Sequence, residues 1–357
     1  MRSLGIKLLA FAAVAIMATP AFAQTDTYGA KADVVMELHP SKIVDSPLGK
    51  KLDFKSQLEA ASRNAGPESP DFSKLDRVFA GLVAPENVEN LEKIQQGEQN
   101  QMEFFVRLEF STVEAASKII AQAIEENGGV IEKNGIKYYK APDDTRGMPD
   151  GTVMFQPDDK TIELASEGFA YRTNQMPLTD ALTTAWKAMP NEALKLSIDG
   201  VNARGLMKSL AEEGKKKAGG DPVSAAVMDL LPSMDNINLS VDLASTNLLT
   251  MTMVGNKEEN ASDIHDGIKV LLTGVKPKAN EFISMLRAQA PESADVFGQV
   301  ISDMDVKRKD KTVTLHVPRP EGFEDATVEV IPLLQGIVFQ MMMSGMGGAG
   351  GPGGGGF

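Results

Sequence analysis

Alternating apolar and polar positions predict a series of short strands along this chain of 357 residues. In the clearest case, Asn-Ile-Asn-Leu-Ser-Val-Asp-Leu at residues 236–243, every second side chain is apolar. A period of two is typical of a strand with one buried face and one face in water. Similar segments predict strands at residues 34–38, 75–83, 102–110, 193–198 and 248–254, and hairpins that pair 130–133 with 136–140, 152–155 with 161–165, and 304–308 with 312–317.

Helices are predicted between these strands, at residues 48–61, 112–126, 201–217, 222–231, 257–272 and 279–290. Ser46-Pro47 predicts the start of the first helix, because serine is a favoured N-cap and proline is favoured at the first helical position. Alternating strands favour an antiparallel sheet with one packed face, which the helices then cover. The predicted fold class is α+β, with either two sheets side by side or one long curved sheet.

The order of strand and helix occurs twice. Around Ser117 and Ser262, which are 145 positions apart, the chain shows a strand, a helix and a glycine stop. The strands that begin at Leu75 and Met234 match at an offset of 159, and an extra polar loop after Pro85 accounts for the difference. The sequence therefore predicts two pseudo-repeated β-α-β-β-α units, each followed by a hairpin.

The predicted domain boundaries follow from this repeat. We expect a first α+β unit at residues 24–176, a helical linker at residues 177–191, and a second α+β unit at residues 192–320. The linker carries Trp186, the only tryptophan of the chain.

Residues 1–23 have the pattern of a secretory signal peptide. Basic Arg2 and Lys7 precede a short apolar stretch, and a small-x-small cleavage site leaves Gln24 as the first mature residue. The apolar stretch is too short to span a bilayer, which takes about 20 apolar residues. We therefore expect an exported protein, periplasmic or extracellular, with no integral membrane span after cleavage.

The other end of the chain contains two different segments. Residues 321–343 are predicted to form an apolar helix, whose part at 328–343 docks either on the core or on a membrane. Residues 344–357 are mostly glycine, and such a composition cannot bury enough apolar surface to offset its backbone entropy. We expect this tail to be disordered.

Charge and cysteine content exclude several classes of function. The chain has 36 basic and 49 acidic side chains, a net charge of −13, which disfavours nucleic acid and anionic lipid as partners. It has no cysteine, which excludes a cysteine nucleophile, a thiolate metal site and a lipid-modified N-terminal cysteine. An exported protein without disulfides needs a core large enough to be stable by itself.

Every candidate for chemistry has a simpler structural explanation. The three histidines lack metal-ligand spacing, the acidic loops fit turn chemistry better than calcium binding, and the basic clusters suit a helix end and a hairpin tip. The methionines could bind copper, but apolar packing explains them better. The residues concerned are His39, His265, His316, Asp143, Asp144, Asp150, Asp158, Asp159, Lys215–Lys217, Lys307, Arg308, Lys309, Lys311, Met341–Met343 and Met346. We predict no catalytic, cofactor-binding or metal site.

The segments at residues 32–52 and 78–83 resemble uncharacterised exported bacterial proteins with paired α+β units. The resemblance implies a fold and no activity. We therefore expect a non-enzymatic exported protein that acts as a binding or envelope-associated structural module, with an unknown protein as partner. A periplasmic carrier of an apolar, lipid-like ligand held between sheet and helices is the first alternative, and a carboxylate-based hydrolase is the second.

Overall fold

A computed structural model describes residues 32–65, 71–83, 103–127, 130–133, 135–140, 151–167, 170, 178–189, 192–217 and 228–333. The predicted signal peptide at residues 1–23 and the glycine-rich tail at residues 344–357 lie outside the described residues, so those two predictions remain untested.

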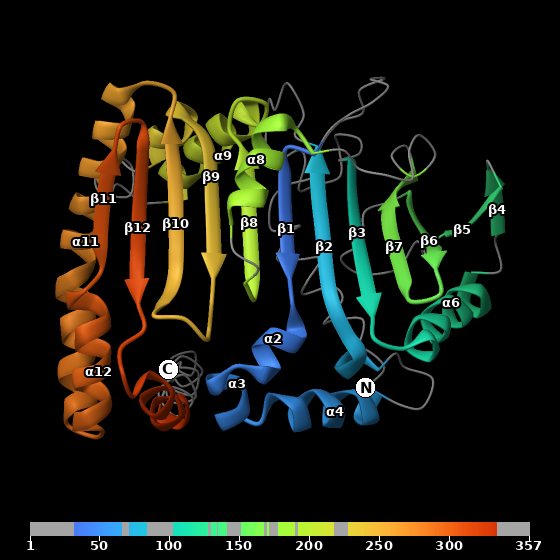
Figure 1. The fold of residues 1–357 in the computed structure, drawn as a ribbon, viewed down its shortest axis with the longest axis horizontal. Coiled ribbons are helices and arrows are strands. Elements are labelled where there is room, and N and C mark those ends of the chain that lie inside the picture. Colours follow the sequence, from blue (N-terminus) through green and yellow to red (C-terminus); the bar gives the residue numbers. More distant parts are fainter. Residues whose placement is uncertain are drawn as a thin grey trace, which may run out of the picture.

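The described strands form one antiparallel sheet of twelve strands, in the order β11-β12-β10-β9-β8-β1-β2-β3-β7-β6-β5-β4 (Figure 1). This large sheet confirms the mixed α+β class and selects one long sheet over two separate ones. The strands are β1 Val34–Leu38, β2 Leu75–Val83, β3 Glu103–Phe110, β4 Val130–Lys133, β5 Ile136–Lys140, β6 Thr152–Asp158, β7 Thr161–Ser166, β8 Leu194–Asp199, β9 Met234–Val241, β10 Asn247–Gly255, β11 Asp305–Lys309 and β12 Thr312–Pro318.

The helices differ from the sequence prediction in two places. The single helix expected at residues 48–61 is divided into two, α3 and α4, and the two expected at 257–272 and 279–290 are one helix that continues through Pro277. Two further helices, α2 and α12, were not predicted. The helices are α2 Pro40–Asp45, α3 Pro47–Lys51, α4 Phe54–Ala65, α6 Val113–Asn127, α8 Asp180–Ala188, α9 Arg204–Lys217, α11 Glu258–Arg287 and α12 Pro291–Ser302.

The centre of the sheet is an antiparallel seam between β1 and β8. Met36 lies opposite Leu196, Val34 opposite Ile198 and Leu38 opposite Leu194. Strand order runs outward from the seam as β1-β2-β3-β7-β6 on one side and β8-β9-β10-β12-β11 on the other. In one half β3 lies beside β7, the last strand of the β6–β7 hairpin. In the other half β10 lies beside β12, the last strand of the β11–β12 hairpin.

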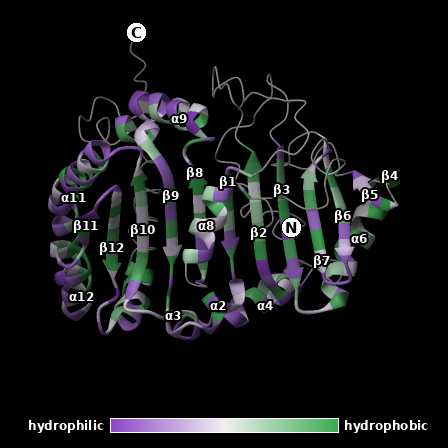
Figure 2. Ribbon diagram, turned by 45° about the horizontal axis from the view of Figure 1, so that its top comes forward, coloured by the Kyte–Doolittle hydropathy of each residue, from purple (hydrophilic) through white to green (hydrophobic). Residues whose placement is uncertain are grey.

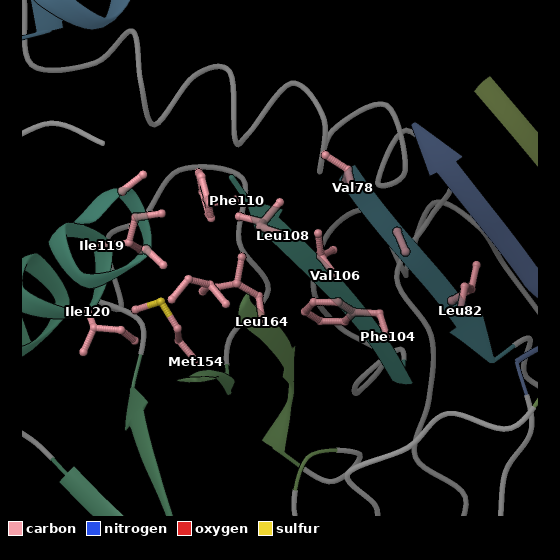
Figure 3. Packing of buried hydrophobic residues seen from close by; sticks show 14 of the residues in the cluster. Val78, Leu82, Phe104, Val106, Leu108, Phe110, Ile119, Ile120, Met154 and Leu164 are labelled. Atoms are coloured by element: carbon pink, nitrogen blue, oxygen red, sulfur yellow. The ribbon is translucent and has the colours of Figure 1, made fainter. Parts of the chain in front are cut away.

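One face of the sheet, here called the helix face, carries most of the core. Hydrophobic and hydrophilic positions alternate along the strands (Figure 2). On the helix face Leu82, Val106 and Leu108 of the strands and Ile119 of α6 belong to one buried cluster, the one with the most buried residues described (Figure 3). In the second half α11 covers Met253 and Val313. The prediction that the helices cover a single face is wrong for α8, whose Leu182 is buried on the opposite face with Ala32 and Val35.

The apolar segment near the C-terminus is partly described. Residues 323–333 are helical, and Val330 and Leu333 pack against Ile283 and Leu286 of α11. This part docks on the core, as one of the two alternatives for the segment requires, and residues 334–343 lie outside the described residues. No helix in the described ranges combines the length and apolarity needed to cross a membrane.

Candidate functional site

An apolar pocket of about 390 Å³ lies between the sheet and the helices that follow β1. Strands β1, β2 and β3 form its floor, and α2 and α4 form its outer wall, at the lower ends of these strands in Figure 1. Of the twelve described lining residues, only Gln57 has a polar side chain. The lining is Leu38, Pro40, Ile43, Val44, Phe54, Gln57, Leu58, Ala61, Phe72, Leu75, Val78 and Leu108.

The outer wall of the pocket depends on a tight corner between α2 and α3. Ser46 caps α3 by accepting a hydrogen bond from the Gly49 backbone N–H at 2.9 Å, and its hydroxyl donates to the Ile43 carbonyl at 2.7 Å. A Cβ on Gly49 would lie 1.9 Å from that same carbonyl oxygen, so only glycine fits. The predicted N-cap at Ser46-Pro47 is confirmed.

The corner between α3 and α4 explains why the predicted single helix is divided. Asp53 has φ of 51°, in the left-handed region that a helix interior does not allow. This residue redirects the chain, so that α4 lies across the ends of β2 and β3 and turns Phe54, Leu58 and Ala61 toward the pocket.

The floor of the pocket is continuous with the main core. Val78 and Leu108 line the pocket and also belong to the buried cluster in Figure 3. Because the strands beneath are hydrogen-bonded to their neighbours, the floor is closed. Access to the pocket is therefore from the side of α2 and α4.

The opposite face of the sheet carries a row of charged side chains behind this floor. Glu37 on β1 accepts a hydrogen bond from Arg77 Nε at 2.5 Å, and Lys195 Nζ lies 2.7 Å from its second oxygen. Farther along the row Arg107 binds Glu163, with Nη2 at 2.8 Å from Oε2. Lys195 also lies over the Trp186 ring, 4.7 Å from its centroid.

The pKa values of the two buried carboxylates of this row are shifted in opposite directions. Burial acts to raise the pKa of Glu37, but Lys195 and Arg77 together outweigh it and hold the pKa below its ordinary value. The pKa of Glu163 is raised by burial, against the effect of Arg107. His39 lies 3.3 Å from Glu37, and burial lowers its pKa, so it is neutral near pH 7. The row is thus a structural network of paired charges.

Those histidines and acidic residues singled out in the sequence that the structure describes are not brought together. His265 contacts its neighbour Asp266 at 2.9 Å, and His316 lies 3.3 Å from the Thr250 hydroxyl. Asp158 accepts a hydrogen bond from the Lys160 backbone N–H at 2.9 Å, which supports the turn interpretation. Within the described ranges no three His, Asp or Glu side chains are grouped closely enough to hold a metal ion.

The basic clusters and methionines divide between described and undescribed segments. Lys215 pairs with Asp229, and Lys307 pairs with Asp305 at 2.5 Å. Outside the described residues lie Asp143, Asp144, Asp150, Met341–Met343 and Met346.

The sequence prediction missed the pocket and the pairing of Glu37 with Arg77 and Lys195. The apolar face of the predicted first helix included Leu58, which does line the pocket. Apolar residues such as Ile43 and Val44 read equally well as core, because a sequence does not show whether neighbouring side chains fill the space between them.

Comparisons with known proteins add no function. No protein-family model matches the sequence, and no curated protein does. Among solved structures the chain is similar to TP0453 in crystal form I, at 10% identity and a TM-score of 0.39, over 86% of this chain and 97% of that chain. For crystal form III of TP0453 the identity is 12% and the TM-score 0.36, over 86% and 99%. At these values the likeness carries no argument about the site.

Proposed function

We propose that this protein is a non-enzymatic binding protein that holds an apolar ligand, the acyl chain of a lipid, in the pocket beneath α2 and α4. The observation that supports this most is the lining, in which eleven of twelve described residues are apolar. Its volume of about 390 Å³ falls in the range of small-molecule pockets, about 300–1,000 Å³. Each methylene transferred from water into such a site contributes about 0.8 kcal/mol.

A binding experiment tests this proposal directly. A fluorescent long-chain alcohol, which is apolar and uncharged, is titrated into the purified protein and into the variant Ala61→Phe. The phenyl ring added on α4 fills part of the pocket, so we expect affinity to fall more than tenfold. Ala121→Phe, on the exposed side of α6, adds the same ring outside the pocket and should leave affinity unchanged.

Native mass spectrometry provides a second test. A protein purified without detergent should carry a co-purified lipid, which Ala61→Phe should lack. If no lipid co-purifies and the alcohol binds the parent and both variants equally weakly, the proposal of a lipid carrier is wrong. The envelope-associated structural module then becomes the better proposal.

The hydrolase alternative draws no support from the described residues. It requires two carboxylates that face each other in a cleft. Glu37 and Glu163 lie on the sheet face opposite the pocket, and each is held by a basic side chain. The proposal that the protein is not an enzyme therefore stands beside the carrier.

We also propose that the two halves of the sheet descend from one duplicated unit. A β-bulge supports this: Leu75 pairs with Phe110 and Arg77 with Glu109, while Met234 pairs with Gly255 and Asn236 with Val254. In each half an aspartate, Asp76 or Asp235, is the extra residue of the bulge. The offset of 159 predicted from the sequence aligns these two aspartates.

Two other correspondences support duplication. A short 3₁₀ helix precedes β2 at Phe72–Lys74 and β9 at Leu231–Ser233. The offset of 145 aligns the first residue of α6, Val113, with that of α11, Glu258. Deleting Asp76 or Asp235 should destabilise the protein in both cases, because loss of a bulge residue shifts the strand register by one, and deleting Asp235 also removes its ion pair with Arg204. If either deletion leaves urea unfolding unchanged, the bulges do not play the same part in the two halves, which would count against duplication.

Export is part of the proposal and rests on the signal-peptide pattern. Expression of the full chain in a bacterial host should yield a periplasmic or secreted protein. N-terminal sequencing should begin at Gln24, and a protein that retains Met1 in the cytoplasm would contradict export.

A further inference from the structure

The helices that wall the pocket are basic, although the protein is acidic. Residues 40–65 carry five basic and three acidic side chains, a net charge of +2, against −13 for the whole chain. Lys50, Lys55 and Arg63 are exposed, and none of them is ion-paired within the described part of the chain. Among the exposed basic residues described in this segment, only Lys51 forms an ion pair with another element, and its partner is Asp325.

The position of Lys55 is not explained by helix stability. It lies in the first turn of α4, which contains no acidic residue. The amino end of a helix dipole is positive, so a cation there is unfavourable. An external anion that contacts this surface would offset the cost.

The place of this charge matters because α2 and α4 form the outer wall of the pocket. An acyl chain is nearly insoluble in water and is available mainly from a bilayer. The sheet closes the opposite side of the pocket, so the side of α2 and α4 must face the bilayer when the chain is transferred.

Resting on the proposed function, we infer that the exposed surface of α2–α4 contacts an anionic lipid bilayer and delivers the pocket to it. The net charge of −13 does not prevent this contact, because the Debye length at physiological ionic strength is about 8 Å and the local charge dominates at contact. Each lysine near an anionic surface strengthens binding about fivefold.

The test measures co-sedimentation with vesicles of phosphatidylglycerol and of phosphatidylcholine at low and physiological salt. The parent protein should bind phosphatidylglycerol and not phosphatidylcholine. The variant Lys50→Glu with Lys55→Glu should lose at least about twentyfold in affinity for phosphatidylglycerol, since two attractive charges become repulsive.

Helix α9 offers a matched control. It is also basic, with five basic and two acidic side chains, and it lies at the opposite end of the helix face (Figure 1). Lys208 and Lys216 are exposed on it. The variant Lys208→Glu with Lys216→Glu changes net charge by the same amount and should bind phosphatidylglycerol within about threefold of the parent.

Two results would overturn the inference: equal binding to both lipids, or the same loss in both double variants. Binding of the fluorescent long-chain alcohol in solution, without vesicles, is measured in parallel. If the alcohol binds and the vesicles do not, the inferred membrane contact is wrong and the proposal of a lipid carrier is retained. If the alcohol fails to bind, the carrier itself is wrong.

Discussion

The two ends of the helix face are built alike but filled differently. Under α2 and α4, the floor residues Leu38, Leu75, Val78 and Leu108 face an open pocket. At the other end the matching floor positions are Ile198, at an offset of 160 from Leu38, Met234 and Ile237, at the offset of 159, and Met253, at the offset of 145. There Met207 of α9, Ile264 and Ile268 of α11, and Leu230 occupy the space.

This difference shows that an apolar floor alone does not make a pocket. Both floors are β-sheet positions with large aliphatic side chains, and both are covered by helices. The filled end uses two methionines, whose flexible side chains fit irregular gaps. The pocket end uses branched residues under a divided helical segment, whose corner at Gly49 and Asp53 holds α4 away from the strands.

The sheet face behind the two floors also differs, and this gives the largest expected effect. Glu37 behind the pocket corresponds to Ser197, which donates to Asn238 at 2.6 Å behind the filled end. Glu37→Gln removes the charge between Arg77 and Lys195, and we expect a loss of about 3 kcal/mol in urea unfolding at pH 7. Ser197→Ala should lose about 1 kcal/mol.

The two variants should respond differently to acid. Because the pKa of Glu37 lies below its ordinary value of 4.5, its contribution to stability is present above that pH and is lost as pH falls through the lowered pKa. The deficit of Glu37→Gln should therefore shrink in acid, whereas that of Ser197→Ala should not change. A constant deficit for both would contradict the assigned pKa direction.

Truncation at the two ends should have unequal effects on stability. Met253→Ala leaves a new cavity in the filled end and should cost about 3 kcal/mol. Leu58→Ala enlarges a pocket that already exists, on a half-buried helix, and should cost about 1 kcal/mol. Thermal and urea unfolding measure both. Equal costs would show that the pocket is packed shut in solution.

Enlarging a side chain should also cost more at the filled end than at the pocket. Ala211 is buried at 3% exposure on α9, one turn after Met207 of the filled end, and Ala211→Phe should overpack its surroundings at about 2 kcal/mol. Ala61→Phe enters empty space and should change the free energy of unfolding by less than about 0.5 kcal/mol. A large loss in Ala61→Phe would mean that its affinity loss reflects misfolding and not occupation of the pocket.

The smallest effect concerns the corner itself. Asp53→Gly relieves a left-handed backbone and should stabilise the protein by about 0.5 kcal/mol, after the added freedom of the unfolded chain is included. Asp310, which also has φ of 51° but lies at the β11–β12 hairpin, is the control. Only Asp53→Gly should also alter affinity for the fluorescent alcohol.

The strands were the part of the fold that could be predicted, because alternation reports burial on one face directly. The predictions 75–83 and 34–38 match β2 and β1 residue for residue. The helices were harder, because the glycine stop at Gly274 predicted a break. Helix α11 continues because Ile264 packs on the sheet and Ile283 packs on α12, while Pro277 itself is exposed.

The candidate site could be predicted only as a general possibility. An apolar carrier between sheet and helices was one alternative, but its position depends on where volume is left unfilled. That volume results from the corner at Gly49, whose close approach to Ile43 is invisible in the sequence. The partners of Glu37 are Arg77 and Lys195. Both are distant from Glu37 along the chain, so no local sequence pattern indicates them.

The seam between β1 and β8 has a consequence for assembly. Under an offset of 160 its pairs exchange places: Val34 with Ile198 becomes Leu194 with Leu38. During synthesis β1 emerges long before β8, and until then it presents an unpaired edge beside β2. The same register would fit β8 of another chain. Slow completion of the second half therefore exposes this fold to domain-swapped pairing, in which two chains exchange halves through one common seam.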